Sequence, residues 1–198
     1  MKRLLLVAIA VLYASVARAT PIVFTANLSG LNENPVTPSL GTGLATLILD
    51  PVAQTLQMNV TFSGLTSNTI AAHIHCCLPA PLSPNNVGVA TTVPAFPGFP
   101  LGVTAGTYSS PVFDLTQPLI YNPAFITLQG NSLPQAEAAL IAGIMNSETY
   151  LNIHTVMFGG GEIRGILTPA AAPVPEPATL SLLGLGIGGL IAARRRRT

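Results

Sequence analysis

Residues 150–165 read YLNIHTVMFGGGEIRG, and the rest of the chain is best understood outward from this segment. Two β-type runs, 150–155 and 162–165, are separated by a turn that contains three consecutive glycines. A glycine-containing loop between two such runs predicts an antiparallel hairpin. The segment also holds His154, one of three histidines, and Arg164, the only basic residue between positions 20 and 173.

The other two histidines, His73 and His75, form a His-x-His pair in the segment 69–75, which we also predict to be a strand. Side chains at i and i+2 of a strand leave from the same face, with Cα atoms about 6.5 to 7 Å apart. If this strand pairs with or faces residues 149–155, His154 supplies a third nitrogen and Glu162 a carboxylate oxygen. Such a ligand set suits Zn²⁺ or Cu²⁺.

The alternative is a structural hydrogen-bond network with no ligand. In this network the histidine pair bonds to Asn152 or Thr155, and Glu162 pairs with Arg164 two residues further on. A buried polar network of this kind fixes the register of the strands. Both hypotheses, the metal site and the structural network, remain open at the level of sequence.

The two cysteines, Cys76 and Cys77, are neighbours and directly follow His75. In an oxidising compartment two cysteines suggest a bridge, but neighbours close only a small ring and cannot join distant parts of a fold. A vicinal disulfide, two free thiols and intermolecular pairing are all open. Thiolates beside a His-x-His pair would also suit a soft metal ion.

Hydrophobic alternation predicts a mostly antiparallel β fold. Expected strands are 22–28, 43–49, 55–62, 69–75, 149–155 and 162–167, with shorter pieces at 87–91 and 110–115 inside a proline- and glycine-rich stretch. One helix is expected where Ser132 can cap and Gln135 completes a capping box. Its apolar stripe is formed by Leu133, Ala136, Leu140 and Ile144 and ends near Asn146.

Both ends of the chain have the features of targeting segments. Lys2 and Arg3 precede the apolar run 4–16, and Ala17-Arg18-Ala19 matches a cleavage site, so we interpret residues 1–19 as a secretory signal peptide. The alternative is an uncleaved N-terminal anchor. Near the other end, residues 170–177 form a small-residue linker that ends in a Pro-Glu-Pro motif.

Residues 178–198 are predicted to be a transmembrane helix with a basic tail. The apolar run 178–193 is just short of a full span and would need some thinning of the bilayer. The basic tail would stay on the cytoplasmic side and leave the domain outside. The residues of this end that carry the signal are Pro175, Glu176, Pro177, Arg194, Arg195, Arg196 and Arg197.

The order of motif, apolar span and arginine cluster resembles a bacterial PEP-CTERM sorting signal. The resemblance implies recognition by an exosortase, removal of the span, and delivery to the cell surface or extracellular matrix. A plain tail anchor is the alternative. Export through the Sec translocon and cleavage by signal peptidase would come first.

A second resemblance covers most of residues 20–169. The runs FTANLSG (24–30) and NENP (32–35), AHIH (72–75), and the 150–155 and 161–165 segments resemble the motifs of the chordin-type CHRD domain, in the same order. The family implies an extracellular, antiparallel Greek-key or immunoglobulin-like β-sandwich, here with one short helix, and no defined activity. The adjacent cysteines and the long proline-rich middle depart from the family pattern.

The charge of the domain and the motifs in its sequence reduce the number of function classes to consider. Residues 20–173 carry one arginine against six carboxylates, a formal net charge of −5, which disfavours nucleic-acid binding. Three imidazoles are too few for a two-metal copper–zinc superoxide dismutase, and no P-loop, Rossmann or glycosidase pattern is present. We therefore expect that the protein is not an enzyme and that it has no catalytic residues. The expected role is binding or structural, with polysaccharide or a surface protein as partner, and metal binding is the alternative.

Overall fold

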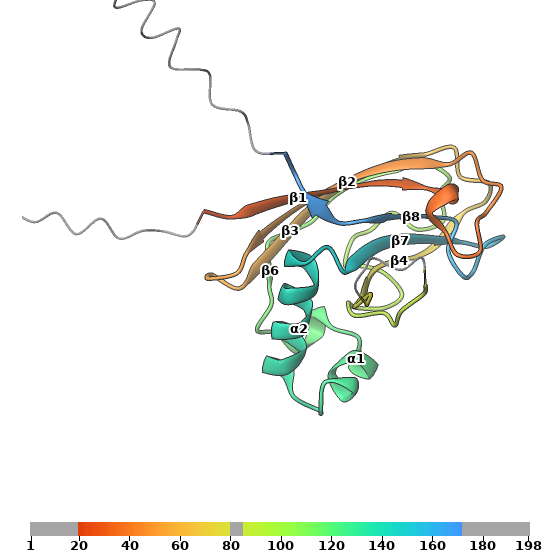
Figure 1. The fold of residues 1–198 in the computed structure, drawn as a ribbon. Coiled ribbons are helices and arrows are strands. Elements are labelled where there is room, and N and C mark those ends of the chain that lie inside the picture. Colours follow the sequence, from red (N-terminus) through yellow and green to blue (C-terminus); the bar gives the residue numbers. More distant parts are fainter. Residues whose placement is uncertain (1–19, 80–84, 172–198) are drawn as a thin grey trace, which may run out of the picture.

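A computed structural model describes residues 20–79 and 85–171 of the chain (Figure 1). The expected signal peptide, most of the linker, the Pro-Glu-Pro motif and the C-terminal helix lie outside the described residues. Among the residues that are described, no helix is long and apolar enough to cross a membrane.

The described residues form one sheet of nine strands. The strands are β1 (Ile22–Ser29), β2 (Thr42–Asp50), β3 (Thr55–Ser63), β4 (Thr69–Cys76), β5 (Gly106–Ser109), β6 (Phe113–Asp114), β7 (Thr149–Thr155), β8 (Ile163–Ile166) and β9 (Thr168–Pro169). The six main strands predicted from alternation are confirmed. The sequence missed β5, and the piece expected at 87–91 makes only isolated bridges, between Val89 and His75 and between Thr91 and Tyr121.

Two α-helices, rather than the one expected, occur in the described part of the chain: α1 (Pro123–Leu128) and α2 (Leu133–Met145). The predicted cap of α2 is confirmed, because the Ser132 hydroxyl accepts a hydrogen bond from the backbone N–H of Gln135 at 3.4 Å. Helix α1 has only six residues, too few to show an apolar period. Its start is nevertheless marked by Asn122, whose side chain accepts from the Ala124 N–H, and by Pro123 in the first turn.

The sheet is continuous and strongly curled, so the prediction of two separate sheets packed as a sandwich is corrected. Its strand order is β4-β7-β8-β1-β2-β3-β5, with β6 paired to β3 and β9 paired to β1. Strand β1 makes the connection, because it pairs along its whole length with β2 on one side and with β8 and β9 on the other. Figure 1 shows the sheet bending over α2.

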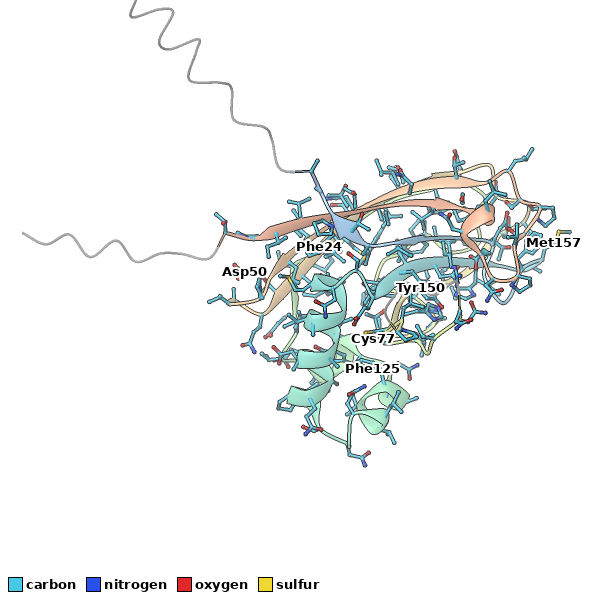
Figure 2. All side chains as sticks on the ribbon, viewed as in Figure 1. Phe24, Asp50, Cys77, Phe125, Tyr150 and Met157 are labelled. Carbon is cyan, nitrogen blue, oxygen red and sulfur yellow. A yellow bond between two sulfur atoms is a disulfide. The ribbon has the colours of Figure 1, made fainter. Side chains whose placement is uncertain are left out.

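The core lies on the concave side of the sheet. Strands β1, β2 and β3 bury every second residue there, and helix α2 closes the core with Ala136, Leu140 and Ile144. Figure 2 shows side chains filling the space between the sheet and the helices, where Cys77 and Phe125 are labelled. Alternation with period two is what makes each of these strands half-buried.

Strand β7 differs, because all seven of its residues are buried. Leu151 and Ile153 face the core, so by alternation Asn152 and His154 point to the opposite side of the sheet. That side is covered by backbone from residues 87–94 and 158–161. The hairpin of β7 and β8 is therefore sandwiched between the apolar core and a second, polar buried layer.

The structure joins Cys76 and Cys77 by a disulfide at the end of β4. The two sulfur atoms lie 3.7 and 3.6 Å from the Ala139 carbonyl oxygen of helix α2. A Cβ added to Gly143, one turn further along this helix, would lie 2.6 and 2.8 Å from the two sulfurs. Glycine at this position therefore lets the helix approach the disulfide.

Gly143→Val is expected to lower the free energy of unfolding by about 3 kcal/mol, because the added carbons overlap sulfur atoms that cannot move independently. Ala142→Val introduces the same side chain at the adjacent exposed position of α2 and should cost below about 1 kcal/mol. Urea denaturation of both variants measures the difference. Equal losses in the two variants would show that the close packing of α2 on the disulfide has no energetic weight.

Candidate metal site

The three histidines of the domain converge on one buried point. His73 and His75 are on β4, and the pairing of β4 with β7 places His73 opposite Asn152, two residues from His154 on the same face. The ring centroid of His73 lies 4.8 Å from that of His75 and 4.6 Å from that of His154. One ring nitrogen from each residue lies within 4.8 Å of the other two. The pairing of the two strands, left open by the sequence, therefore brings all three imidazoles together.

Backbone carbonyls hold each ring in place. Nδ1 of His73 lies 3.2 Å from the Pro94 oxygen, Nδ1 of His75 lies 2.7 Å from the Val87 oxygen, and Nδ1 of His154 lies 3.0 Å from the Gly159 oxygen. A carbonyl oxygen can only accept, so each Nδ1 carries the hydrogen and each Nε2 presents a lone pair. Imidazoles that ligate metals are oriented in this way by their second nitrogen.

The three Nε2 atoms are buried and have no hydrogen-bond partner among the described residues. Leaving a buried acceptor unsatisfied costs about 1–3 kcal/mol for each group. A metal ion would satisfy all three at once. Three ligands bound to one ion at about 2.0–2.1 Å lie about 3.3–3.6 Å apart. Ring nitrogens that lie within 4.8 Å of one another therefore need to close by up to about 1.5 Å to bind one ion.

The imidazoles are neutral in the folded protein. Burial lowers the pKa of His73 to about 3, with a smaller contribution from the neighbouring His154 and His75. Burial likewise lowers the pKa of His75 to about 4. The pKa of His154 is also lowered by burial. Neutral imidazole is the form that binds a metal, so the site is ready for a cation at neutral pH.

The structure does not bring Glu162 to the histidines, which corrects its predicted place as a fourth ligand. Its carboxylate accepts from the Ser39 hydroxyl at 2.6 Å, the Thr66 N–H at 2.6 Å and the Thr155 hydroxyl at 2.5 Å. Thr155 follows His154 on β7, so the two side chains point to opposite faces. Burial alone would raise the pKa of Glu162, but these hydrogen bonds outweigh it and lower that pKa.

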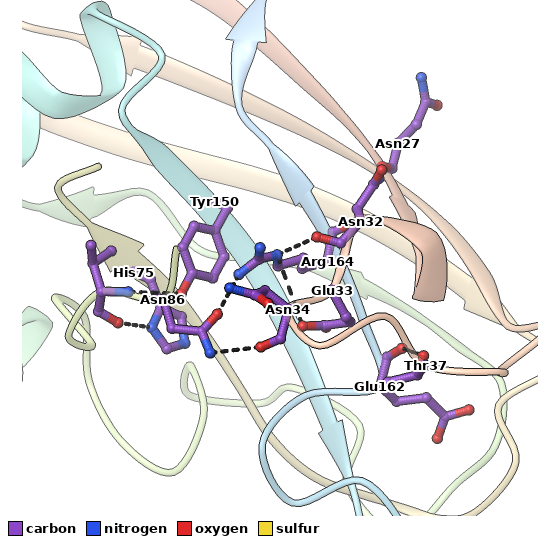
Figure 3. Close-up of polar contacts among 11 residues, drawn as sticks. Asn27, Asn32, Glu33, Asn34, Thr37, His75, Asn86, Tyr150, Glu162 and Arg164 are labelled. Carbon is purple, nitrogen blue, oxygen red and sulfur yellow. Dashed lines mark hydrogen bonds and ion pairs between the residues drawn. The ribbon is translucent and has the colours of Figure 1, made fainter. Parts of the chain in front are cut away.

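Arg164 also has different partners from those predicted. It pairs with Glu33 at 3.9 Å instead of Glu162, and its Nε donates to the Asn32 carbonyl (Figure 3). Its guanidinium lies 4.6 Å from the centre of the Tyr150 ring. Tyr150 in turn stacks on His75 with ring centroids 4.6 Å apart. A continuous stack therefore runs from the histidine cluster through Tyr150 to Arg164.

Asn152 completes the buried polar layer without bonding to the histidines. It lies between His73 on β4 and Arg164 on β8 in the strand register. Its Oδ1 atom is buried without a partner among the described residues, and so is Oε1 of Glu33. Asn152, Glu162 and Arg164 therefore do not form one network as predicted, because Glu162 and Arg164 bond to separate loops.

Sequence reasoning missed the groups that orient the rings. The carbonyls of Val87, Pro94 and Gly159 belong to loops, and a carbonyl acceptor leaves no trace in side-chain identity. Glu33 was noted only within the NENP run at 32–35, with no role assigned to it. Burial with only a single nearby cation raises the pKa of Glu33 to about 7.

Acidification is expected to destabilise the metal-free protein. Between pH 6 and 5, His73 and His75 are largely protonated when unfolded but neutral when folded, so the unfolded state binds more protons. The lowered pKa of His154 acts in the same direction. Glu33 acts in the opposite direction, because its raised pKa lets the folded state hold one proton that the unfolded state has lost. The net difference is about one to two protons, so the free energy of unfolding should fall by about 1.4–2.5 kcal/mol per pH unit.

Urea denaturation in EDTA at pH 7.5, 6 and 5 measures this slope. Glu33→Gln removes the opposing group, and the slope should then rise by about one proton, about 1.4 kcal/mol per pH unit. Stability that is constant or increases between pH 6 and 5 in the unsubstituted chain would contradict the neutral, buried state of the cluster.

A curled antiparallel β domain with a buried three-histidine cluster is the class of protein that the fold and the site define. A family model for the CHRD domain matches residues 24–167, and a model for the PEP-CTERM protein-sorting motif matches residues 173–197. The chain belongs to the CHRD domain family, as the sequence motifs predicted. The sorting motif implies export, processing by an exosortase and sorting to the cell surface. No curated protein and no solved structure matches the chain.

Proposed function

We propose that this exported CHRD domain binds one transition-metal ion, zinc or copper, through the Nε2 atoms of His73, His75 and His154. The observation that carries the proposal is the convergence of three buried imidazoles, each with an unpartnered Nε2 and each oriented by a backbone carbonyl. Imidazole is a suitable ligand for both metals. A purely structural network would be expected to give these nitrogens hydrogen-bond donors instead.

The proposed role is non-catalytic. Zinc enzymes keep an open position for water or substrate at the metal. Here each Nε2 is buried, and the rings are enclosed between the sheet and two loops. Storage, sequestration or sensing of the ion at the cell surface fits an enclosed site better than turnover does.

The proposed location follows from both ends of the chain. Residues 1–19 would direct the protein to the Sec translocon and be removed by signal peptidase. The 178–198 segment would hold it transiently in the inner membrane, with the domain outside, until an exosortase releases it to the cell surface or extracellular matrix. The metal would then be acquired in the periplasm or outside the cell.

Elemental analysis of the protein purified without chelator tests the proposal. About one zinc or copper per chain is expected, and a His73→Ala/His75→Ala variant should contain neither. A metal-free wild type, combined with a variant that only melts at a lower temperature, would show that the histidines form a structural network instead.

A second candidate function is binding of extracellular polysaccharide or of a surface protein. The surface location alone would permit either. An open cavity of about 550 Å³ beside Arg164 favours this candidate, because its volume is in the usual range for ligand sites.

A further inference from the structure

The cavity beside Arg164 lies on the outer face of β1 and β8, next to the loop 31–36. It has a volume of about 550 Å³, and both Tyr150 and Arg164 contribute to its lining. Because Tyr150 and Arg164 are almost fully buried, they form the floor, and the exposed residues of the loop form the walls. Figure 3 shows Asn27, Asn32 and Asn34 around the Arg164 end of this region.

Above the raised pKa of Glu33, about 7, the floor of the cavity carries no net charge. Arg164 and Glu33, only 5 % and 6 % exposed, pair at 3.9 Å. Arg164 is further held by the Asn86 side chain at 2.7 Å and by the Tyr150 ring. Since the domain around this pair has a formal net charge of −5, the cavity offers no attraction to an acidic ligand.

The walls combine free amides with apolar side chains. The side chains of Asn27 and Asn34 are exposed and have no protein partner among the described residues, and each amide offers both donors and an acceptor. Leu31 and Val36, which are 78 % and 60 % exposed, lie beside them in the lining. A ligand that suits such walls presents hydroxyl groups at its edges and C–H groups on its faces.

We propose that this cavity binds a short segment of a neutral polysaccharide. Asn27 and Asn34 hydrogen-bond the sugar hydroxyls, and Leu31 and Val36 contact the apolar faces of the sugar rings. The proposal deepens the second candidate function by assigning it a site and a ligand class. It does not depend on the metal, because none of the three histidines contributes to the lining of this cavity.

Calorimetric titration at pH 8 of the full chain, kept in a detergent without a sugar headgroup and treated with EDTA, tests this site. The probes are the neutral tetrasaccharides of glucose (β-1,4 and α-1,4 linked) and of N-acetylglucosamine, with a galacturonic acid oligomer as the acidic comparison. At least one neutral probe is expected to bind at millimolar concentration or below, and more tightly than the acidic oligomer. Asn34→Ala and Leu31→Ala should each weaken that binding by about threefold to tenfold.

Leu40→Ala is the matched control, since Leu40 is 92 % exposed in the same connection but does not line the cavity. It should leave the affinity unchanged. All three substitutions are at exposed positions, so an unchanged melting temperature will separate lost binding from lost folding. Absence of binding by every neutral probe, preference for the acidic oligomer, or equal effects of Leu31→Ala and Leu40→Ala would each overturn the proposal. Using metal-free protein keeps this result separate from the outcome of the metal analysis.

Discussion

His154→Ala is expected to remove most of the thermal stabilisation that zinc or copper gives to the protein. An ion present at one hundred times its dissociation constant stabilises the folded state by about 2.7 kcal/mol. His154 supplies one of three ligands and the only one from β7. If its loss weakens binding by about a hundredfold, the gain at the same metal concentration falls to about 0.4 kcal/mol.

Differential scanning calorimetry with EDTA, and then with each metal, measures this change. Asn152→Ala is the control, because Asn152 is buried on the same face of β7 but has no ring nitrogen. This control should lower the melting temperature of the metal-free protein and keep the shift on metal addition. A His154→Ala variant that retains the full shift would show that the metal binds elsewhere.

Glu162→Ala is expected to destabilise the fold by about 3–5 kcal/mol. The carboxylate is 0 % exposed and accepts from the Ser39 hydroxyl, the Thr66 N–H and the Thr155 hydroxyl. Its removal takes an acceptor from donors of three chain segments, one of which is the buried Thr155 hydroxyl. Because these segments are far apart in the sequence, the loss of the three hydrogen bonds should appear as global unfolding in urea denaturation.

Glu148→Ala is the matched control, since Glu148 is only half-buried and its carboxylate makes no hydrogen bond among the described residues. It should cost below about 1 kcal/mol. Glu162→Gln, which preserves the volume of the side chain, should bind the same amount of metal as the wild type. A loss below about 1 kcal/mol in Glu162→Ala, or metal loss in Glu162→Gln, would contradict the assigned role of Glu162.

The sequence predicted the strands well because each carries a local signal. Alternation located β1 to β4, β7 and β8, and the spacing of His73 and His75 placed both imidazoles on one face of β4. The convergence with His154 was stated only as a condition, since strand pairing is a long-range property. The pairing of β4 with β7 satisfies that condition.

The sheet architecture and the partners of Glu162 and Arg164 could not be predicted from local sequence patterns. A single curled sheet and a two-sheet sandwich bury the same alternating residues, and they differ only in whether β1 pairs on both sides. The sequence predicts Glu162 as a carboxylate ligand beside His154 on the condition that the strands pair, but Glu162 follows Gly161, whose φ of 128° changes the direction of the chain. The partner of Arg164 comes from the loop after β1, more than 100 residues away in sequence.

X-ray absorption spectroscopy at the metal edge, on protein purified without chelator, tests the central claim most directly. The spectrum should show imidazole scattering from about three histidines at a metal–nitrogen distance of about 2.0–2.1 Å. No sulfur ligand is expected, because Cys76 and Cys77 are joined to each other. A first shell of oxygen without imidazole scattering, or a sample with no metal at the edge, would contradict the three-histidine site.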